Sequence, residues 1–169
     1  MKTASERLVQ WMRDAHAMEE QAERILQAES RRIENYPELK ARIDRHLEET
    51  RRQAERLKAR LDQLDGGTSW TKDAMANLIG IAQGLSGVFA GDEVMKASLA
   101  NYTFEHMEIA SYKMLIATAE EAGDMQSKRV CEENLREEED MASWLEQHLA
   151  PMTRQFLLRE EMPGATAKR

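Results

Sequence analysis

The sequence predicts an all-α fold in which four long amphipathic helices pack into a bundle. Apolar residues recur at three- and four-residue steps along four separate segments, as they do on one face of a helix. Aromatic residues make up only 5% of the 169-residue chain and charged residues 33%, a composition typical of helices with solvated outer faces. Six of the eight glycines lie between residues 66 and 91, where they separate two pairs of helical segments.

Local signals bound the first two predicted helices. Thr3 and Glu6 have the spacing of a capping box at the start of the first helix. The segment Asn35-Tyr36-Pro37 interrupts the pattern, because proline suits the first turn of a new helix and disfavours helical backbone before it. The second helix then runs to about Leu64 and ends at Asp65-Gly66-Gly67.

Residues 66–91 form the connection between the two helix pairs. One interpretation is a loop with a weak helix. A second interpretation is geometric: a helix of about 28 residues is about 42 Å long, and this connection is long enough to return over that distance. The third helix would then run parallel to the second, as in ferritin-like proteins. We therefore predict a ferritin-like four-helix bundle with a long, partly helical crossover between helices two and three.

The second half of the chain supplies two further helices. Asp92 is a candidate N-cap for the third helix, and Leu99 is one of the apolar residues expected on its buried side. Gly123-Asp124 provides a stop for the third helix and a cap for the fourth. Pro151 is expected to end the fourth helix.

The predicted domain organisation follows from that proline. Residues 1–150 are expected to form the ferritin-like bundle. Residues 151–169 are expected to form a C-terminal extension, in which a short amphipathic helix over residues 152–162 precedes a loose tail.

Charge and cysteine content exclude several classes of function. The net charge of −7 disfavours nucleic acid and anionic membrane surfaces as partners, because both attract basic proteins. Cys131 is the single cysteine, so no intrachain disulfide can form and a reducing compartment is favoured. No segment has the length and apolarity of a membrane span or a signal peptide. We expect a cytoplasmic protein.

Each predicted helix places a carboxylate among its apolar residues near mid-length. In the second helix, the positions where leucine would be expected also hold His46, Thr50 and Gln53. Burial of such groups costs several kcal/mol without compensation, roughly as for other desolvated polar groups, so this departure from the apolar pattern indicates a functional site. The acids are Glu19, Glu49, Glu105, Glu108 and Glu138.

Five carboxylates cannot share a dry core as free anions, because desolvation and mutual repulsion would protonate most of them. Two divalent cations would neutralise four of the five charges. Oxygen ligands with a single imidazole suit iron, or alternatively manganese, better than structural zinc. Taken singly, Glu19 is also explained as an acid at the edge of an apolar stripe, and His46 as a hydrogen-bonded core histidine. Glu108 alternatively pairs with an arginine or lysine.

The chain resembles the YciF-type stress-response proteins of the ferritin-like superfamily. The resemblance is carried by residues 13–19, by His46-Leu-Glu-Glu-Thr50 with Gln53, by Glu105-His-Met-Glu-Ile-Ala-Ser-Tyr112, and by Leu135-Arg-Glu-Glu138. It implies a four-helix bundle with a dinuclear metal centre, and homodimers. The ligands that it implies are Glu19, His46, Glu49, Glu105, Glu108 and Glu138.

The sequence also departs from patterns of the wider superfamily. Ferritin-like di-iron sites commonly carry Glu-x-x-His in two helices, whereas the second helix here has His46 three residues before Glu49. Met141 stands where a histidine would follow Glu138, and no Cys-x-x-Cys motif provides a second metal site. These departures leave the redox reaction open.

Two functions therefore compete. The first is a dinuclear iron or manganese protein of bacterial stress defence, acting on oxygen or peroxide or sequestering metal. The second is a metal-free bundle that dimerises or binds a partner and carries a degenerate polar core. Thr50 and Gln53 are candidates for orienting ligands, although Thr50 is more simply explained by a bond to its own helix. Tyr112 is a candidate donor to a ligand carboxylate, although it is more simply interpreted as a core aromatic.

Overall fold

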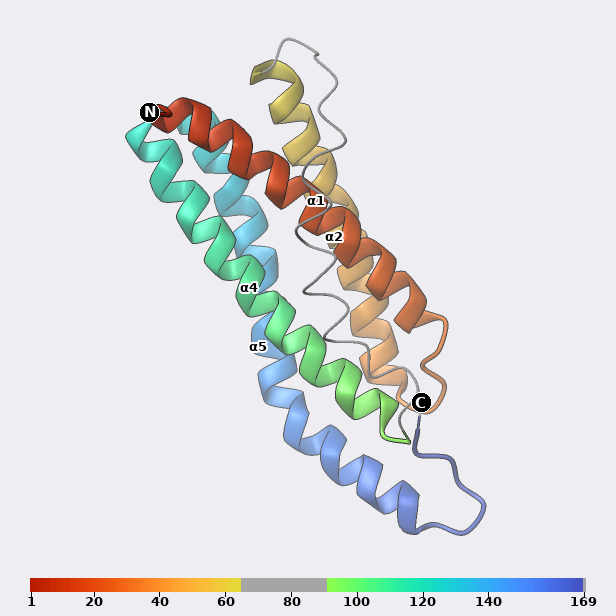
Figure 1. The fold of residues 1–169 in the computed structure, drawn as a ribbon. Coiled ribbons are helices and arrows are strands. Elements are labelled where there is room, and N and C mark those ends of the chain that lie inside the picture. The colour runs from red at the N-terminus through yellow and green to blue at the C-terminus, as the bar shows by residue number, and fades with distance from the viewer. Residues whose placement is uncertain (65–90, 169) are drawn as a thin grey trace.

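The computed structural model describes residues 1–64 and 91–168. Within these ranges the chain forms four helices and no strand: α1 (Ala4–Ser30), α2 (Pro37–Leu64), α4 (Glu93–Glu121) and α5 (Met125–Glu161). Figure 1 shows these helices side by side in an elongated bundle. The predicted all-α four-helix bundle is confirmed.

The helices form two antiparallel pairs, α1 with α2 and α4 with α5, and each pair packs closely. Helices α2 and α4 run in the same direction, so the end of α2 and the start of α4 lie at opposite ends of the bundle (Figure 1). This order of directions is the ferritin-like one. The predicted helical character of the crossover falls on residues 65–90, outside the described part of the chain.

Side chains cap the starts of α1 and α5 as predicted. The Thr3 hydroxyl accepts a hydrogen bond from the Glu6 amide at 3.2 Å, and the Glu6 carboxylate accepts one from the Thr3 amide at 2.8 Å. Helix α2 begins at Pro37. The carboxylate of Asp124 accepts a hydrogen bond from the Ser127 amide at 3.0 Å, which caps α5.

Two apolar clusters fill the bundle on either side of its middle. One contains Met12, Leu57, Leu115 and Cys131, and the other contains Leu26, Tyr36, Ile43 and Leu145, among others. Burial raises the pKa of the Cys131 thiol to about 12, which disfavours the reactive thiolate. Along α2 and α5, buried polar residues such as Gln53 and Glu138 lie between members of the two clusters.

The prediction that Pro151 ends the fourth helix is wrong, because α5 continues through Pro151 to Glu161. The proline removes one backbone hydrogen bond and costs about 3 kcal/mol in a helix interior. Met152 and Phe156 are both 6% exposed and join the second apolar cluster, so their burial compensates for the proline. The expected boundary at residue 150 therefore lies inside one continuous helix.

The prediction that Leu99 lies on the buried side of the third helix is also wrong, since Leu99 is 61% exposed. The buried face of α4 instead carries Ser98 and Asn101, whose polar groups are satisfied locally. Ser98 donates to the Val94 carbonyl at 2.8 Å, and Asn101 donates to the Glu29 carboxylate at 2.7 Å. These hydrogen bonds offset the desolvation cost of burying the two polar side chains. The pattern of apolar residues in the sequence does not show such bonds.

The C-terminal tail is docked on the bundle, in contrast to the loose tail expected. The Tyr36 hydroxyl donates to the Ala167 carbonyl at 2.6 Å, and Ala167 is buried. The amide of Val94, in the first turn of α4, donates to the Lys168 carbonyl at 3.0 Å. Asp92 is the N-cap residue, but its side chain makes no capping bond, so the tail provides an acceptor at this helix start.

We expect Ala167→Glu to lower the free energy of unfolding by about 1–3 kcal/mol, because the new carboxylate cannot be buried against Tyr36 without a partner. Thermal and urea unfolding measure the change. Thr166→Glu is the matched control, because the Thr166 side chain is exposed. Equal stability of the two variants would contradict a docked tail.

Candidate metal centre

The six residues expected to bind metal all lie in the interior of the bundle. Glu19 comes from α1, His46 and Glu49 from α2, Glu105 and Glu108 from α4, and Glu138 from α5. None of them is more than 5% exposed. All four helices therefore contribute a carboxylate to one buried region.

His46 lies at the centre of this region. Its Nε2 atom is 3.2 Å from Glu105 Oε2 and 3.5 Å from Glu138 Oε2, so one imidazole nitrogen faces carboxylates from two other helices. Its Nδ1 atom is 3.1 Å from Glu49 Oε2 on its own helix. The ring is thus fixed from both sides.

Four of the six residues can offer ligand atoms to a single point. One atom from each of His46, Glu105, Glu108 and Glu138 can be chosen so that all lie within 4.8 Å of one another. Ligands on opposite sides of an ion at about 2.1 Å are about 4.2 Å apart, so the four groups need to close only slightly around a cation. Glu19 and Glu49 lie outside this group of four.

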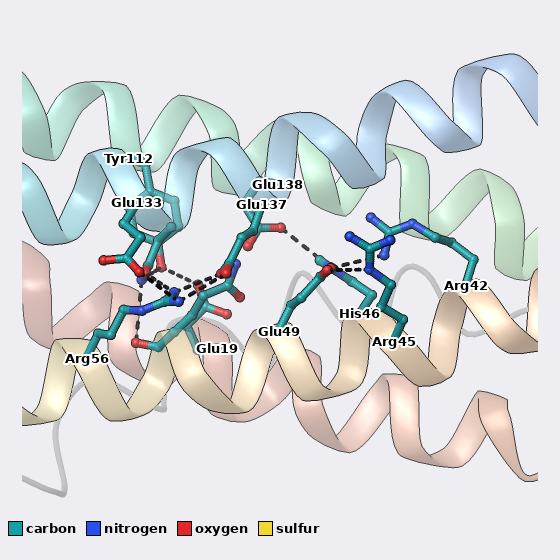
Figure 2. Close-up of polar contacts among 12 residues, drawn as sticks. Glu19, Arg42, Arg45, His46, Glu49, Arg56, Tyr112, Glu133, Glu137 and Glu138 are labelled. Atoms are coloured by element: carbon teal, nitrogen blue, oxygen red, sulfur yellow. Dashed lines mark hydrogen bonds and ion pairs between the residues drawn. The ribbon is translucent and has the colours of Figure 1, made fainter.

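Glu49 is held by cations of its own helix (Figure 2). Its Oε2 atom accepts a hydrogen bond from Arg42 Nη1 at 3.0 Å, and its Oε1 atom accepts one from Arg45 Nε at 2.9 Å. Burial raises the pKa of the Glu49 carboxyl, but the hydrogen bonds from His46 and the two arginines outweigh it and lower the value to about 2. Glu49 is therefore an ionised, fully partnered carboxylate.

Glu19 is bound by Tyr112 across the bundle. The Tyr112 hydroxyl donates to Glu19 Oε1, and the hydroxyl in turn accepts a hydrogen bond from Asn134 Nδ2 at 2.9 Å. Arg56 donates to Asn134 Oδ1 at 3.0 Å and links this chain to Glu137 at the bundle surface (Figure 2). Of the two interpretations of Tyr112, donation to a candidate ligand carboxylate is the one that the hydrogen bond to Glu19 supports.

Several polar atoms of this region form no hydrogen bond with any described residue. They include both side-chain polar atoms of Gln53, which is fully buried. Native proteins leave few buried polar atoms unsatisfied, so a group of them in one place calls for an ion or water. The carboxylate oxygens in this state are Glu19 Oε2, Glu105 Oε2, Glu108 Oε1, Glu138 Oε1 and Glu138 Oε2.

Burial and mutual repulsion change the protonation of the carboxylates. Burial raises the pKa of Glu19 from 4.5 to about 8, with the hydrogen bond from Tyr112 acting in the opposite direction. Burial and neighbouring carboxylates raise the pKa values of Glu108 and Glu138 well above the ordinary range. Burial lowers the pKa of His46, but Glu105, Glu49 and Glu138 outweigh it and raise the value well above 6.5. Without metal, the region holds several protons.

Sequence reasoning missed Arg42 and Asn134. Asn134 lies three residues after Cys131 and four before Glu138, so its helical register marks it as buried. Arg42 lies four residues before His46 and seven before Glu49, which puts it near the same face of α2. In both cases the spacing was informative, but the polar residue type suggested solvent exposure.

These observations define the class of protein: an all-α four-helix bundle with a buried histidine–carboxylate cluster between its helices. Residues 3–158 match the family described as "Domain of unknown function (DUF892)". The chain belongs to this family.

Relatives with known structures share the fold. The chain is 33% identical to the protein YciF of Escherichia coli (strain K12) over 146 residues, which cover 82% of this chain and 85% of that protein. A protein from Xanthomonas campestris pv. campestris matches with a TM-score of 0.81 and 39% identity, covering 95% and 100% of the two chains. The E. coli stress protein YciF matches with a TM-score of 0.75 and 27% identity, covering 89% and 96%. The resemblance to YciF-type proteins is confirmed.

Among the described helices, none combines the length and apolarity that crossing a membrane requires.

We expect Glu138→Gln to raise the free energy of unfolding of the metal-free protein by about 1–3 kcal/mol at pH 8, because it removes a buried group whose ionisation is opposed by neighbouring carboxylates. Urea unfolding in the presence of a chelator measures this. Glu139→Gln is the control, because Glu139 is exposed and its change should stay within about 0.5 kcal/mol. A destabilised Glu138→Gln variant would contradict the expected repulsion.

Proposed function

We propose that the protein binds two divalent metal ions, iron in the first place, between its four helices. The observation that carries the proposal is the group formed by His46, Glu105, Glu108 and Glu138, with one potential ligand atom from each within 4.8 Å of the others in a buried region. Glu19 adds a carboxylate with one free oxygen from α1. The neighbouring oxygens that accept no hydrogen bond are available as further ligand atoms.

The charges of the region support two ions rather than one. Glu49 is paired with the buried Arg42, so this pair is neutral. Glu19 and the three carboxylates of the group would together carry a charge of −4, which two divalent cations balance. His46 is then the neutral nitrogen ligand.

The kinds of ligand atom in the site indicate which metals it would bind. Carboxylate oxygens with one imidazole favour iron or manganese, and the absence of a thiolate ligand disfavours structural zinc. Such ions, when bound, supply Lewis acidity and, in the case of iron, redox chemistry with oxygen or peroxide. The residues of this chain hold the ions away from water between two apolar clusters and present ionisable groups that can take up or release protons.

The biological role proposed here is iron–oxygen or peroxide chemistry, or metal sequestration, during stress. The support for stress is the relative from E. coli, whose structure carries the description of a stress protein. We also propose that the protein is cytoplasmic and forms a homodimer.

A second candidate function is a metal-free binding or dimerisation module. The observation that favours it is the position of His46 between Glu105 and Glu138, where an imidazolium ion partly neutralises the carboxylates without any metal. Protonation of the remaining acids would complete the balance.

Metal analysis of protein purified from iron-supplemented cells separates the two functions. We expect about two ions per chain in the wild type and loss of both in Glu138→Gln, because Glu138 contributes two oxygens that accept no hydrogen bond from the described residues. The exposed-site variant Glu139→Gln should retain them. Metal-free protein whose stability is unchanged by a chelator would support the second function. A peroxide-consumption assay on loaded protein then distinguishes catalysis from storage.

Metal affinity should rise with pH. Between its ordinary pKa of 4.5 and its folded value of about 8, Glu19 holds a proton that the unfolded chain releases. The raised pKa therefore lowers the stability of the metal-free protein as pH rises through this window. A metal ion has to displace this proton, so affinity should increase by about tenfold per pH unit for each displaced proton.

Titration calorimetry with Mn²⁺ measures this pH dependence, at about pH 6 and pH 8 and in two buffers of different ionisation enthalpy. The buffers report the number of protons released, which should fall in Glu19→Gln. An affinity that is independent of pH would contradict the raised pKa values.

A further inference from the structure

We infer that Arg42 and Glu49 form a positioning pair for His46, and that Glu49 is not itself a metal ligand. This inference rests on the proposed metal-binding function and assigns different roles to residues around the same site. It changes the role that the family resemblance gives to Glu49.

Both oxygens of Glu49 already have partners on α2. Oε2 is 3.0 Å from Arg42 Nη1 and 3.1 Å from His46 Nδ1, and Oε1 is 2.9 Å from Arg45 Nε. Glu19, Glu108 and Glu138 each retain an oxygen that accepts no hydrogen bond from the described residues, and Glu105 Oε2 faces His46 Nε2 at 3.2 Å. Both oxygens of Glu49 are therefore engaged by residues of α2, and Figure 2 shows these contacts with Arg42, Arg45 and His46.

Glu49 is also placed to orient the imidazole of His46. A histidine that ligates a metal usually donates its other ring N–H to a carboxylate, which fixes the tautomer and the ring orientation. Glu49 Oε2 accepts from Nδ1 of His46, so the metal-binding lone pair is left at Nε2. That atom is the one facing Glu105 and Glu138, at 3.2 and 3.5 Å.

Arg42, the partner of Glu49, is itself buried. Its side chain is 8% exposed and that of Glu49 is 7% exposed, whereas the side chain of Arg45 is 69% exposed. If Glu49 turned away to bind a metal, Arg42 would be left as a buried cation without this partner and close to two divalent ions. Breaking a buried ion pair in this way is strongly unfavourable. Arg42 therefore keeps Glu49 next to His46.

Helix geometry explains why one helix suffices for this arrangement. Side chains lean toward the N-terminus of their helix. Glu49 follows His46 by three residues and Arg42 by seven, so its carboxylate extends back toward both of them. The order His46-x-x-Glu49 therefore suits an orienting carboxylate, in contrast to the Glu-x-x-His order in which both residues commonly ligate.

A charge-paired double variant tests the inference. Zn²⁺ serves as a diamagnetic probe, and its stoichiometry and affinity are measured for the wild type, Arg42→Met, Glu49→Gln and the double variant. Glu49→Gln leaves the buried Arg42 without this partner, and Arg42→Met leaves Glu49 without its buried arginine, so each single variant should weaken binding by about 10–100-fold while still taking up two ions. The double variant is neutral again, and its affinity should recover to within about tenfold of the wild type.

Three further measurements accompany the series. Arg45→Met is the matched control, because its exposed ion pair is screened and its loss should change affinity by less than about threefold. Glu138→Gln is the reference variant for the loss of a metal ligand. Long-range ¹H–¹⁵N spectra of the zinc-loaded wild type should show Nε2 of His46 bound to metal and Nδ1 protonated.

The outcomes distinguish this inference from the proposed function. Loss of an ion in Glu49→Gln, no recovery in the double variant, or zinc on Nδ1 of His46 would overturn the positioning pair while metal binding stands. A wild type that binds no Zn²⁺ and no Mn²⁺ would overturn the proposed function and this inference together. Circular dichroism confirms that each variant is folded.

Discussion

Carboxylates gathered in a dry interior repel one another and lose their hydration, and the rest of the structure has to offset this electrostatic cost. Glu19, Glu105, Glu108 and Glu138 approach one another from three helices, and burial raises the pKa values of three of them. Protons and the imidazole of His46 meet this cost in the metal-free chain. Divalent cations would meet it more completely, since they neutralise charge and satisfy the free oxygens at the same time. The site is thus an electrostatically unfavourable part of the fold, and bound metal would make it favourable.

The rest of the bundle holds these carboxylates in place and keeps water away from them. Apolar clusters on either side exclude water, which strengthens every charge interaction between them. Hydrogen bonds from Tyr112 to Glu19 and from Arg42 to Glu49 fix two of the carboxylates. Capping at Thr3 and the docked tail at Val94 hold helix ends in place, far from the site but along the same helices. Precise ligand geometry requires such rigid elements.

The parts of the structure that the sequence predicted are those controlled by local chemistry. A proline at residue 37 starts a helix, and a carboxylate such as Glu138 in an apolar register is buried, because both depend on residues within one or two helical turns. The parts that it did not predict depend on distant partners. The hydrogen bond from Tyr112 to Glu19 joins residues 93 positions apart. The helix continues through Pro151 because Met152 and Phe156 join an apolar cluster that includes Tyr36, Leu39 and Ala167, all distant in the sequence. No local pattern encodes these contacts.

The central claim is that the buried carboxylates and His46 hold two cations. Anomalous diffraction from crystals grown with Mn²⁺, recorded on both sides of the manganese absorption edge, tests it most directly. The account predicts two anomalous peaks inside the bundle, with His46 Nε2, Glu19, Glu105, Glu108 and Glu138 as the protein ligands and the Glu49 carboxylate still on Arg42. Interior density without an anomalous signal, or manganese only at the surface, would contradict it.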